Sequence, residues 1–340
     1  MSTDFDASAL SEWLQGNLPG FAELLSVEKF PGGQSNPTYR LAAKSGAYVL
    51  RRKPFGQLLP SAHAIEREFK LLQAINPLGF TTPRPLALCE DPAVIGAMFY
   101  VMELVDGRSF WNGALPELHP AERRGVYRSM IGTLAKLHSI DPAAAGLGDF
   151  GRPGNYFARQ VERWTKQYRA AQTEDIPEVE SLIEWLPMTL PEQAGSSIIH
   201  GDYRIDNLIF ARDQPHAIAV IDWELATIGD PLADIAYLLM AWVMPQDGRS
   251  GLSGIDFAGT GIPSLAEAAE IYCHAAGRTA LPDLHWYFAY NLFRLTGIVQ
   301  GVKKRLLDGN ASSTNAGETI AQLIPLARAA WAQACLAGAA

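Results

Sequence analysis

The chain contains few cysteines and no long apolar run. Its three cysteines, Cys89, Cys273 and Cys335, lie far apart, and no two of them have the spacing of metal ligands. An odd and scattered set of this kind indicates free thiols in a reducing compartment rather than a disulfide framework. The longest apolar stretch, residues 235–244, is about half as long as a membrane-spanning helix requires.

Positive charge is also scarce. The 28 Lys and Arg residues are outnumbered by 36 Asp and Glu residues, which gives a formal net charge of −8. Proteins that bind nucleic acid use clustered Lys and Arg on a basic face, so nucleic acid is not expected as the main partner. The first ten residues also lack the basic segment and apolar run of a signal peptide. We therefore expect a soluble, cytoplasmic protein that contacts no membrane.

The length and the patterning of apolar residues predict two lobes. At about 100–200 residues per domain, a chain of 340 residues is long enough for two. The first part contains periodic segments separated by turn residues. Helices are expected over residues 8–26 and 62–75, and strands over residues 38–42, 47–51 and 99–104. Asp106 and Gly107 then interrupt the apolar run, and they mark the expected lobe boundary.

The second part of the chain is mainly helical in pattern. Strand-like segments occur at residues 208–210 and 217–221, and the remainder to residue 340 has helical spacing. We therefore predict an α+β, bilobal fold, and the two acidic motifs, at residues 200–207 and at Asp222, indicate that this fold is protein-kinase-like. Residues 1–104 would form a small lobe with an antiparallel sheet over 28–104, and residues 105–340 a larger helical lobe.

Two acidic motifs indicate the chemistry. Residues 200–207 match the pattern H-x-D-x-x-x-x-N, and Asp222 follows a β-branched apolar run, as in a D-F-G-type motif. Phosphoryl transfer requires positioning and neutralisation of charge rather than covalent help from the protein. Asp202 would meet the acceptor hydroxyl, and Asn207 and Asp222 would offer Mg²⁺ the hard oxygen ligands that it prefers. We assign His200 a packing role beneath the loop, because the Asp supplies the base in this arrangement.

The same residues carry a resemblance to a known family. The sequence resembles the aminoglycoside phosphotransferase/choline kinase superfamily, and within it the phosphotransferase proteins related to the kinase-like domain of acyl-CoA dehydrogenase family members 10 and 11. The similarity extends over nearly the whole chain. Its markers are residues 32–38, 48–54, 58–63, 200–210, 229–234, 293–295 and 300–302.

The resemblance implies an ATP- and Mg²⁺-dependent kinase and assigns roles to single residues. The ATP side would comprise a phosphate loop, a phosphate-binding Arg with its ion-pair partner, and a hinge that meets adenine. In that order, the residues are Gly32, Gly33 and Ser35, then Arg51 and Glu68, then Glu103 and Val105. Asp202 would be the catalytic base, Asn207 and Asp222 would hold Mg²⁺, and Asp230 would brace the catalytic loop.

The nucleotide-binding residues depart from the kinase pattern in two places. The loop at residues 32–35 lacks a full G-x-G-x-x-G, although its backbone N–H groups and Ser35 can still meet phosphate. Arg51 stands where a Lys is usual, and a guanidinium can bind phosphate through two hydrogen bonds. Lys53 lies on the same strand face as Arg51 and is the alternative. We prefer Arg51, because Lys53 is at the strand end before Pro54.

The acceptor is less explicit in the sequence. An acidic run formed by Glu174, Asp175, Glu178, Glu180 and Glu184 would suit a polyamine such as an aminoglycoside, but we interpret it as a solvated face. Basic residues including Arg294 and Lys303 would suit a carboxylate or coenzyme A phosphates. The resemblance implies a small-molecule hydroxyl acceptor, with a hydroxy acid or hydroxyacyl-CoA preferred, and a functional link to an acyl-CoA dehydrogenase. The alternatives are an aminoglycoside or choline-type kinase and a catalytically silent kinase-like binding module.

Overall fold

The N-terminal part of the protein is built on an antiparallel sheet. The computed structural model describes residues 4–31, 36–55, 64–152, 154–247, 249–309 and 316–340. The sheet has five strands in the order β1-β2-β3-β5-β4, and every neighbouring pair is antiparallel. The strands are β1 (Leu24–Lys29), β2 (Thr38–Ala43), β3 (Gly46–Arg52), β4 (Pro85–Cys89) and β5 (Phe99–Glu103).

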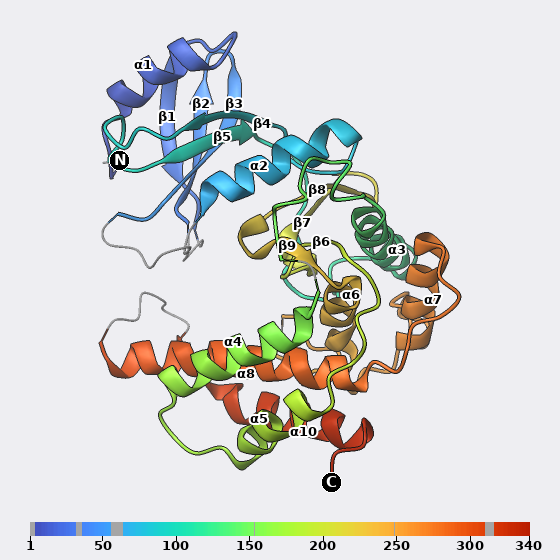
Figure 1. Ribbon diagram of the computed structural model, residues 1–340. Coiled ribbons are helices and arrows are strands. Elements are labelled where there is room, and N and C mark those ends of the chain that lie inside the picture. Colours follow the sequence, from blue (N-terminus) through green and yellow to red (C-terminus); the bar gives the residue numbers. More distant parts are fainter. Residues whose placement is uncertain (1–3, 32–35, 56–63, 153, 248, 310–315) are drawn as a thin grey trace.

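One helix packs on each face of this sheet (Figure 1). α1 (Ala7–Asn17) places Leu10 and Leu14 in a cluster with Leu50 of β3. α2 (Ile65–Ile75) packs Phe69 in a different cluster, together with Val49 of the same strand. Neighbouring side chains of β3 therefore point to opposite faces, as the alternation of a strand requires. The expected antiparallel sheet is confirmed, with α2 as the helix across it.

Two strands of the sheet do not have a clear sequence pattern. β1 falls partly within the helix expected over residues 8–26, which instead ends at Asn17 because Pro19 and Gly20 interrupt it. β4 was not predicted either. β1 is an edge strand with a mixed burial pattern, so neither alternation nor a continuous apolar run distinguishes it from a loop.

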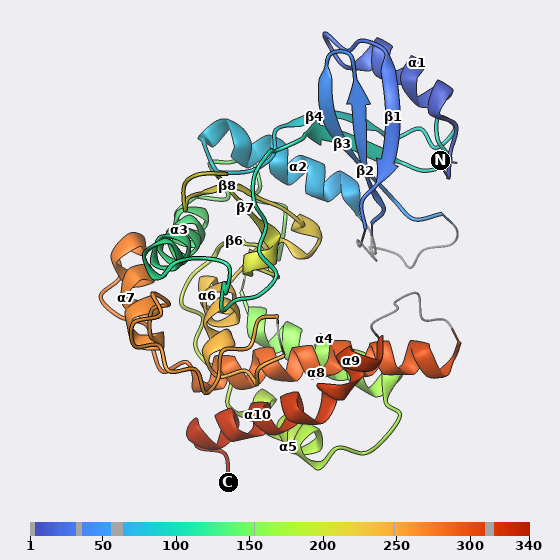
Figure 2. The ribbon, with the colours of Figure 1, turned by 180° about the vertical axis from the view of Figure 1, so that it is seen from behind.

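The C-terminal part of the protein is mainly helical (Figure 2). Its helices are α3 (Pro120–His138), α4 (Tyr156–Ala171), α5 (Pro177–Met188), α6 (Pro231–Leu239), α7 (Leu265–Ala276), α8 (His285–Leu307), α9 (Ala316–Ala321) and α10 (Leu323–Leu336). Two small antiparallel pairs are inserted among them. They are β6 (Ser197–Ile199) with β9 (Thr227–Gly229), and β7 (Leu208–Phe210) with β8 (Ala217–Val220).

The expectation of continuous helix after the strands is wrong for one long segment. The described residues between Val243 and Ser264 form neither helix nor strand. Pro245 starts this segment, and the Asp247 carboxylate accepts hydrogen bonds from the backbone N–H groups of Ser250 and Gly251. Side-chain bonds of this kind compete with the helical pattern, and they stabilise turns instead.

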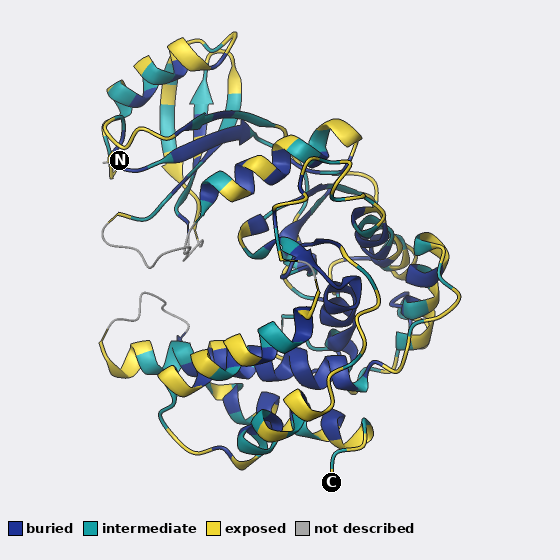
Figure 3. Ribbon diagram, viewed as in Figure 1, coloured by how far each residue is buried: buried dark blue, intermediate teal, exposed yellow. Residues whose placement is uncertain are grey.

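A single large apolar cluster holds the helical part together. It contains residues of α3, α4, α6 and α8, and Figure 3 shows α6 and much of α8 as buried. α8 lies against α10, α4 and α6 and is therefore surrounded by other helices. The run at residues 235–244 is explained by the burial of α6 in this cluster. Among the residues that the structure describes, no helix has both the length and the apolar character to cross a bilayer.

Leu134→Ala should test the cluster. The Leu134 side chain on α3 is fully buried, so we expect a loss of about 2–5 kcal/mol in the free energy of unfolding, measured with urea. Leu336→Ala, at the exposed end of α10, is the matched control and should change stability by about 0.5 kcal/mol or less. Equal losses in the two variants would contradict the assignment of this core.

Candidate active site

The H-x-D-x-x-x-x-N motif forms a loop between β6 and β7. Residues 200–204 follow β6, and a single 3-10 turn, Ile205–Asn207, leads into β7. Gly201 has a φ of +82°, and a Cβ at this position would lie 2.7 Å from the carbonyl oxygen of Leu225. Only glycine accommodates both this conformation and this close approach. The glycine therefore allows the loop to pass against the segment after Asp222.

Asp234, on α6, holds this loop in place through hydrogen bonds to its backbone. Its side chain is 1% exposed, and its carboxylate accepts hydrogen bonds from the backbone N–H groups of His200 at 2.5 Å and Gly201 at 2.8 Å. The expectation that Asp230 has this role is wrong. Asp230 caps the start of α6 through Leu232 N–H and accepts a second bond from Ala194 N–H, which lies before β6.

Asp202 lies at the open side of the loop with a partner on each carboxylate oxygen. Tyr237 donates its hydroxyl to Oδ1 at 2.6 Å, and Asn207 donates Nδ2 to Oδ2 at 3.1 Å. Arg204 Nε lies 3.5 Å from Oδ2. Burial raises the pKa of Asp202, but Arg204, the Tyr237 hydroxyl and Arg294 together hold the pKa below its ordinary value. Asp202 is therefore ionised at neutral pH.

Asn207 and Asp222 are brought together by the pairing of β7 with β8. Leu208 is paired with Val220, and the backbone N–H of Ile221 donates to the carbonyl of Asn207 at 2.9 Å. Asp222 then leaves the strand with a φ of 66°, which is uncommon for a residue other than glycine. The two side chains predicted to share a metal ion therefore project from neighbouring strand ends.

His200 connects the two motifs, as its predicted packing role requires. The ring is fully buried, its Nδ1 accepts from the backbone N–H of Asp202 at 3.2 Å, and its Nε2 lies 2.9 Å from the carbonyl of Ile221. Nε2 therefore carries a proton and donates to that carbonyl. The ring also lies against Trp223, with centroids 4.7 Å apart.

The donor set at Asn207 and Asp222 fits a magnesium ion. The Asn207 amide nitrogen donates to the backbone carbonyl and to the side chain of Asp202, which leaves its carbonyl oxygen available. Asp222 uses Oδ1 for Arg51, and within the described part of the chain no donor bonds its second oxygen. Hard oxygen atoms in small number match the preference of Mg²⁺. Among the described residues, no group of three or more His, Cys, Asp or Glu side chains is arranged to hold a metal.

Arg51 is the charged residue of β3 that reaches these loops. Its Nε lies 3.0 Å from Glu68 Oε2, and its Nη2 lies 2.6 Å from Asp222 Oδ1 and 3.6 Å from Glu224 Oε2. Lys53 instead pairs with Glu66 on the outer side of α2, at 2.8 Å. The expected Arg51–Glu68 ion pair is therefore present, and the alternative pairing of Lys53 with Glu68 is not.

Glu68 is held by groups from both parts of the protein. The side chain is 2% exposed, and Oε1 accepts from the backbone N–H of Trp223 at 3.2 Å. Burial raises the pKa of Glu68 above its ordinary value, although the Arg51 charge opposes this shift. The buried carboxylate thus links α2 of the sheet lobe to the segment that carries Asp222.

The other residues predicted to bind nucleotide are Glu103 and Val105, at and after the end of β5, and three residues of the loop at 32–35. Glu103 ends β5, and its side chain and N–H bond to Arg84. Val105 lies two residues after Glu103. Its backbone N–H donates to no residue that the structure describes, so this N–H is available to a ligand. Gly32, Gly33 and Ser35 lie outside the described residues, as does the marker segment 58–63.

A cavity of about 1600 Å³ opens beside Asp202. Asp202, Arg204 and Tyr237 line it near the catalytic loop. Much of the rest is apolar, with side chains from the end of α6, the following segment, α8 and α10. These are Leu238, Met240, Trp242, Met244, Leu295, Ile298, Val299 and Leu326.

The acidic run at residues 174–184 contributes nothing to this cavity. None of its five acidic residues lines the cavity. Glu174 pairs with Lys303, and Glu180 pairs with Arg169 at 2.5 Å. The interpretation of this run as a surface feature is in keeping with these contacts. Of the basic residues weighed for the acceptor, Arg294 does line the cavity.

Several residues of the site were missed from the sequence. Asp234 lies inside the 229–234 marker, so its position next to Asp230 was a usable signal. Arg204 lies within the H-x-D-x-x-x-x-N segment but is not part of the pattern. Tyr237 gives no signal, because one tyrosine in a run of apolar residues is usually a core residue.

Asp234→Asn should destabilise the protein, because the amide keeps only one acceptor oxygen and turns its NH₂ donor toward one of the two backbone N–H groups that need an acceptor. We expect a loss of about 1–3 kcal/mol in the free energy of unfolding at pH 7. Burial raises the pKa of Asp234, but His138 and His200 lower it below the ordinary value. Its contribution is thus complete above the unfolded pKa of about 3.9 and is lost as the pH falls through the lower folded pKa.

Urea unfolding at neutral pH and in acid would measure this difference. Asp256→Asn is the control, since Asp256 is exposed and, within the part of the chain that the structure describes, its side chain bonds the N–H of Ala258 alone. A variant as stable as the control at pH 7 would show that the loop does not depend on Asp234.

Known proteins share this fold and sequence. The model of the phosphotransferase enzyme family matches residues 26–287. Acyl-CoA dehydrogenase family member 10 of Mus musculus is 44% identical over 95% of this chain and 30% of its own length, and member 11 of Gallus gallus is 44% identical over 95% and 43%. The chain thus spans less than half the length of these curated relatives.

Solved structures agree with the sequence relatives. The crystal structure of a putative aminoglycoside phosphotransferase from Ralstonia eutropha has a TM-score of 0.88 and 44% identity, covering 98% of this chain and 99% of that one. Spectinomycin phosphotransferase, solved with ADP and spectinomycin, has a TM-score of 0.64 at 12% identity, covering 97% and 98%, so it shows the kinase-like fold alone. On the extent of the family match and of the identity to these relatives, the chain belongs to the phosphotransferase enzyme family.

Proposed function

We propose that the protein is an ATP- and Mg²⁺-dependent phosphotransferase that phosphorylates a hydroxyl group of a hydroxy acid or hydroxyacyl-CoA. The observation that carries this proposal is the arrangement around Asp202. An ionised carboxylate faces a large cavity and contacts Asn207, which is joined through the backbone to the strand end that carries Asp222. A base for the acceptor and oxygen ligands for a metal therefore occupy adjacent positions, as phosphoryl transfer requires.

On the nucleotide side, the chain offers one cation and two metal ligands. Arg51 would bind the α- and β-phosphates, and Glu68 would keep its guanidinium oriented. Asn207 and Asp222 would hold Mg²⁺, which supplies neutralisation of the phosphate charge. The N–H of Val105 and the backbone of Glu103 would bind adenine, and Gly32, Gly33 and Ser35 would cover the phosphates.

On the acceptor side, Asp202 would orient the hydroxyl and take its proton late, as the bond to phosphorus forms. A carboxylate with a lowered pKa is a weak base toward an alcohol, so it does not ionise the acceptor before the transfer. Its contribution is to hold the hydroxyl in line with the phosphoryl group and to accept the proton in the transition state.

The cavity favours an acyl chain over a polyamine. Its wall contains Met240, Trp242, Met244 and other apolar side chains, which would bury methylene groups. Apart from Asp202, the acidic residues on its wall are Glu224, Asp247 and Glu318, and the nearby Arg204, Arg249 and Arg294 supply opposite charges. The names of the relatives, acyl-CoA dehydrogenases, add association with acyl-CoA chemistry and suggest such an enzyme as a functional partner.

A transfer assay with radiolabelled ATP would test the acceptor class. The acceptors would be hydroxy acids, their coenzyme A esters, an aminoglycoside and choline, each with and without Mg²⁺. We expect labelled product only with Mg²⁺, and most with the hydroxyacyl compounds. Preferred labelling of the aminoglycoside or choline would reject the acyl acceptor. Absence of transfer to every acceptor would favour a silent binding module.

Asp202→Asn should reduce kcat by about 10²–10⁴-fold, the usual contribution of positioned acid–base help. An amide still forms hydrogen bonds but accepts a proton poorly. ATP affinity should change little, because Asp202 faces the acceptor cavity. Steady-state kinetics with the best acceptor, together with nucleotide titration, would measure both. A variant that loses ATP binding yet turns over normally at saturation would show that Asp202 belongs to the nucleotide site.

Arg51→Ala should weaken ATP binding by about 10- to 100-fold, the range expected for hydrogen bonds to a charged group. Arg51→Lys should retain part of the affinity, because the positive charge beside Glu68 remains. Lys53→Ala is the matched control directly after β3, and its partner is Glu66. Isothermal titration with Mg-ATP would compare them. A larger loss in the Lys53 variant would assign the phosphate contact to Lys53.

A further inference from the structure

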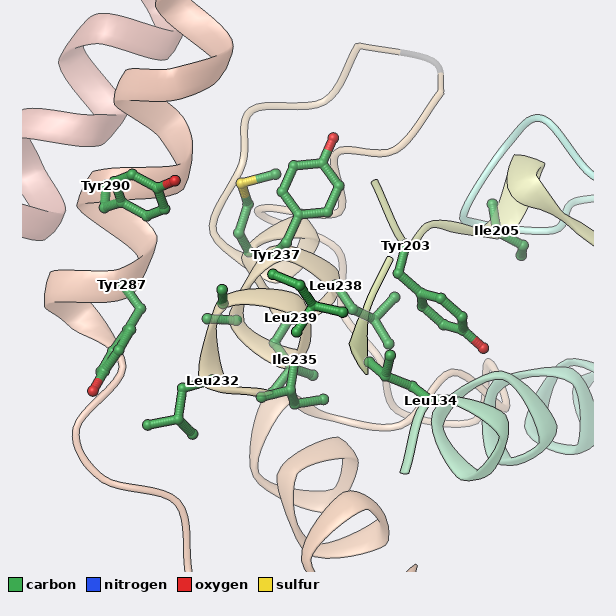
Figure 4. Packing of buried hydrophobic residues seen from close by; sticks show 14 of the residues in the cluster. Leu134, Tyr203, Ile205, Leu232, Ile235, Tyr237, Leu238, Leu239, Tyr287 and Tyr290 are labelled. Carbon is green, nitrogen blue, oxygen red and sulfur yellow. The ribbon is translucent and has the colours of Figure 1, made fainter. Parts of the chain in front are cut away.

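Tyr237 is the residue of α6 that contacts the side chain of Asp202. Its side chain is 5% exposed, and its hydroxyl donates to Asp202 Oδ1 at 2.6 Å. In Figure 4 its ring lies at the edge of the packed cluster, with the hydroxyl directed away from Leu238 and Leu239. Burial raises the pKa of Tyr237 above its ordinary value, so the hydroxyl keeps its proton and acts as a donor.

A second helix holds the Tyr237 ring in place. The guanidinium of Arg294, on α8, lies over the ring with its carbon 4.9 Å from the centroid. Its Nη2 also donates to the carbonyl oxygen of Gly201 at 2.6 Å, and the side chain is buried. α6 and α8 therefore fix the carboxylate of Asp202 and the backbone beside it as one unit.

The two carboxylate oxygens of Asp202 are held from different elements. Oδ1 accepts from Tyr237 on α6, and Oδ2 accepts from Asn207 at the start of β7, with Arg204 beside it. Rotation of the carboxylate about its last bond would break both hydrogen bonds. Asn207 is also a predicted metal ligand, so it belongs to the proposed nucleotide side of the site. Tyr237 lines the cavity, so it belongs to the acceptor side.

We propose that Tyr237 is a positioning residue that fixes the plane of the Asp202 carboxylate for the acceptor hydroxyl. This inference rests on the proposed phosphotransferase function. Tyr237 lines the cavity together with Asp202, so an acceptor hydroxyl that enters meets a carboxylate of fixed orientation. Without the tyrosine hydroxyl, the carboxylate turns away from in-line geometry for part of the time, and turnover slows while nucleotide binding is unaffected.

Tyr237→Phe tests this role, because the phenyl ring still packs under Arg294 and only the hydroxyl is lost. We expect kcat to fall about 10- to 100-fold, the range for a hydrogen bond to a charged group, with an unchanged KM for ATP. Tyr39→Phe is the matched control. Tyr39 is also buried and its hydroxyl also donates to a carboxylate, that of Asp4 at 3.0 Å, but it lies on β2 and does not line the cavity.

A double-mutant cycle separates positioning from a structural role. In an Asp202→Ala background, Tyr237→Phe should reduce the residual kcat by less than about twofold, because no carboxylate remains to be oriented. Tyr39→Phe should have the same small effect in both backgrounds. A Tyr237→Phe loss that persists undiminished without Asp202, or a kcat like that of Tyr39→Phe, overturns the inference. A wild-type chain that phosphorylates no acceptor overturns the proposed function itself.

Discussion

The geometry of the site depends on the buried carboxylate of Asp234. It accepts hydrogen bonds from two successive backbone N–H groups, those of His200 and Gly201, which would otherwise be unsatisfied in the core. This contact sets the turn that presents Asp202 to the cavity. His200, oriented by the same turn, then bonds the carbonyl of Ile221 and fixes the start of the Asp222 segment. One buried charge at the start of α6 thus determines the relative positions of both acidic motifs.

A second set of charged residues joins the sheet lobe to the helical lobe. Arg51 on β3 and Glu68 on α2 meet Asp222 and Trp223, which lie more than 150 residues later in the chain. Breaking a buried ion pair leaves an uncompensated charge, so these residues stabilise each other only as a group. The same group would bind phosphate and metal in the proposed reaction. In the proposed reaction, folding and nucleotide binding would therefore use one set of contacts.

Local pattern was sufficient for much of the fold and for the central motif. The β2–β3 hairpin and α2 have periodic patterns, and β7 and β8 are short apolar runs between turn residues, and the structure contains all of them. β1 and β4 were missed because their apolar residues do not alternate clearly. The segment after Val243 was misjudged because the side-chain bonds of Asp247 replace helical ones. The resemblance assigned the bracing role to Asp230, which is a helix cap, and Asp234, one turn further along α6, was not considered.

The sequence by itself determined the candidate residues of the proposed chemistry. The spacing of the two acidic motifs indicated a base and two oxygen ligands, and the family resemblance indicated the strand arginine. Tertiary structure alone decided which distant side chains bond to the loop that carries Asp202. Tyr237 and Arg294 lie 35 and 93 residues beyond the loop atoms that they bond, and nothing in the local pattern links them. Their roles follow from the packing of α6 against α8, which converts two core residues into neighbours of Asp202. Long-range packing creates such contacts, so they cannot be found from periodicity.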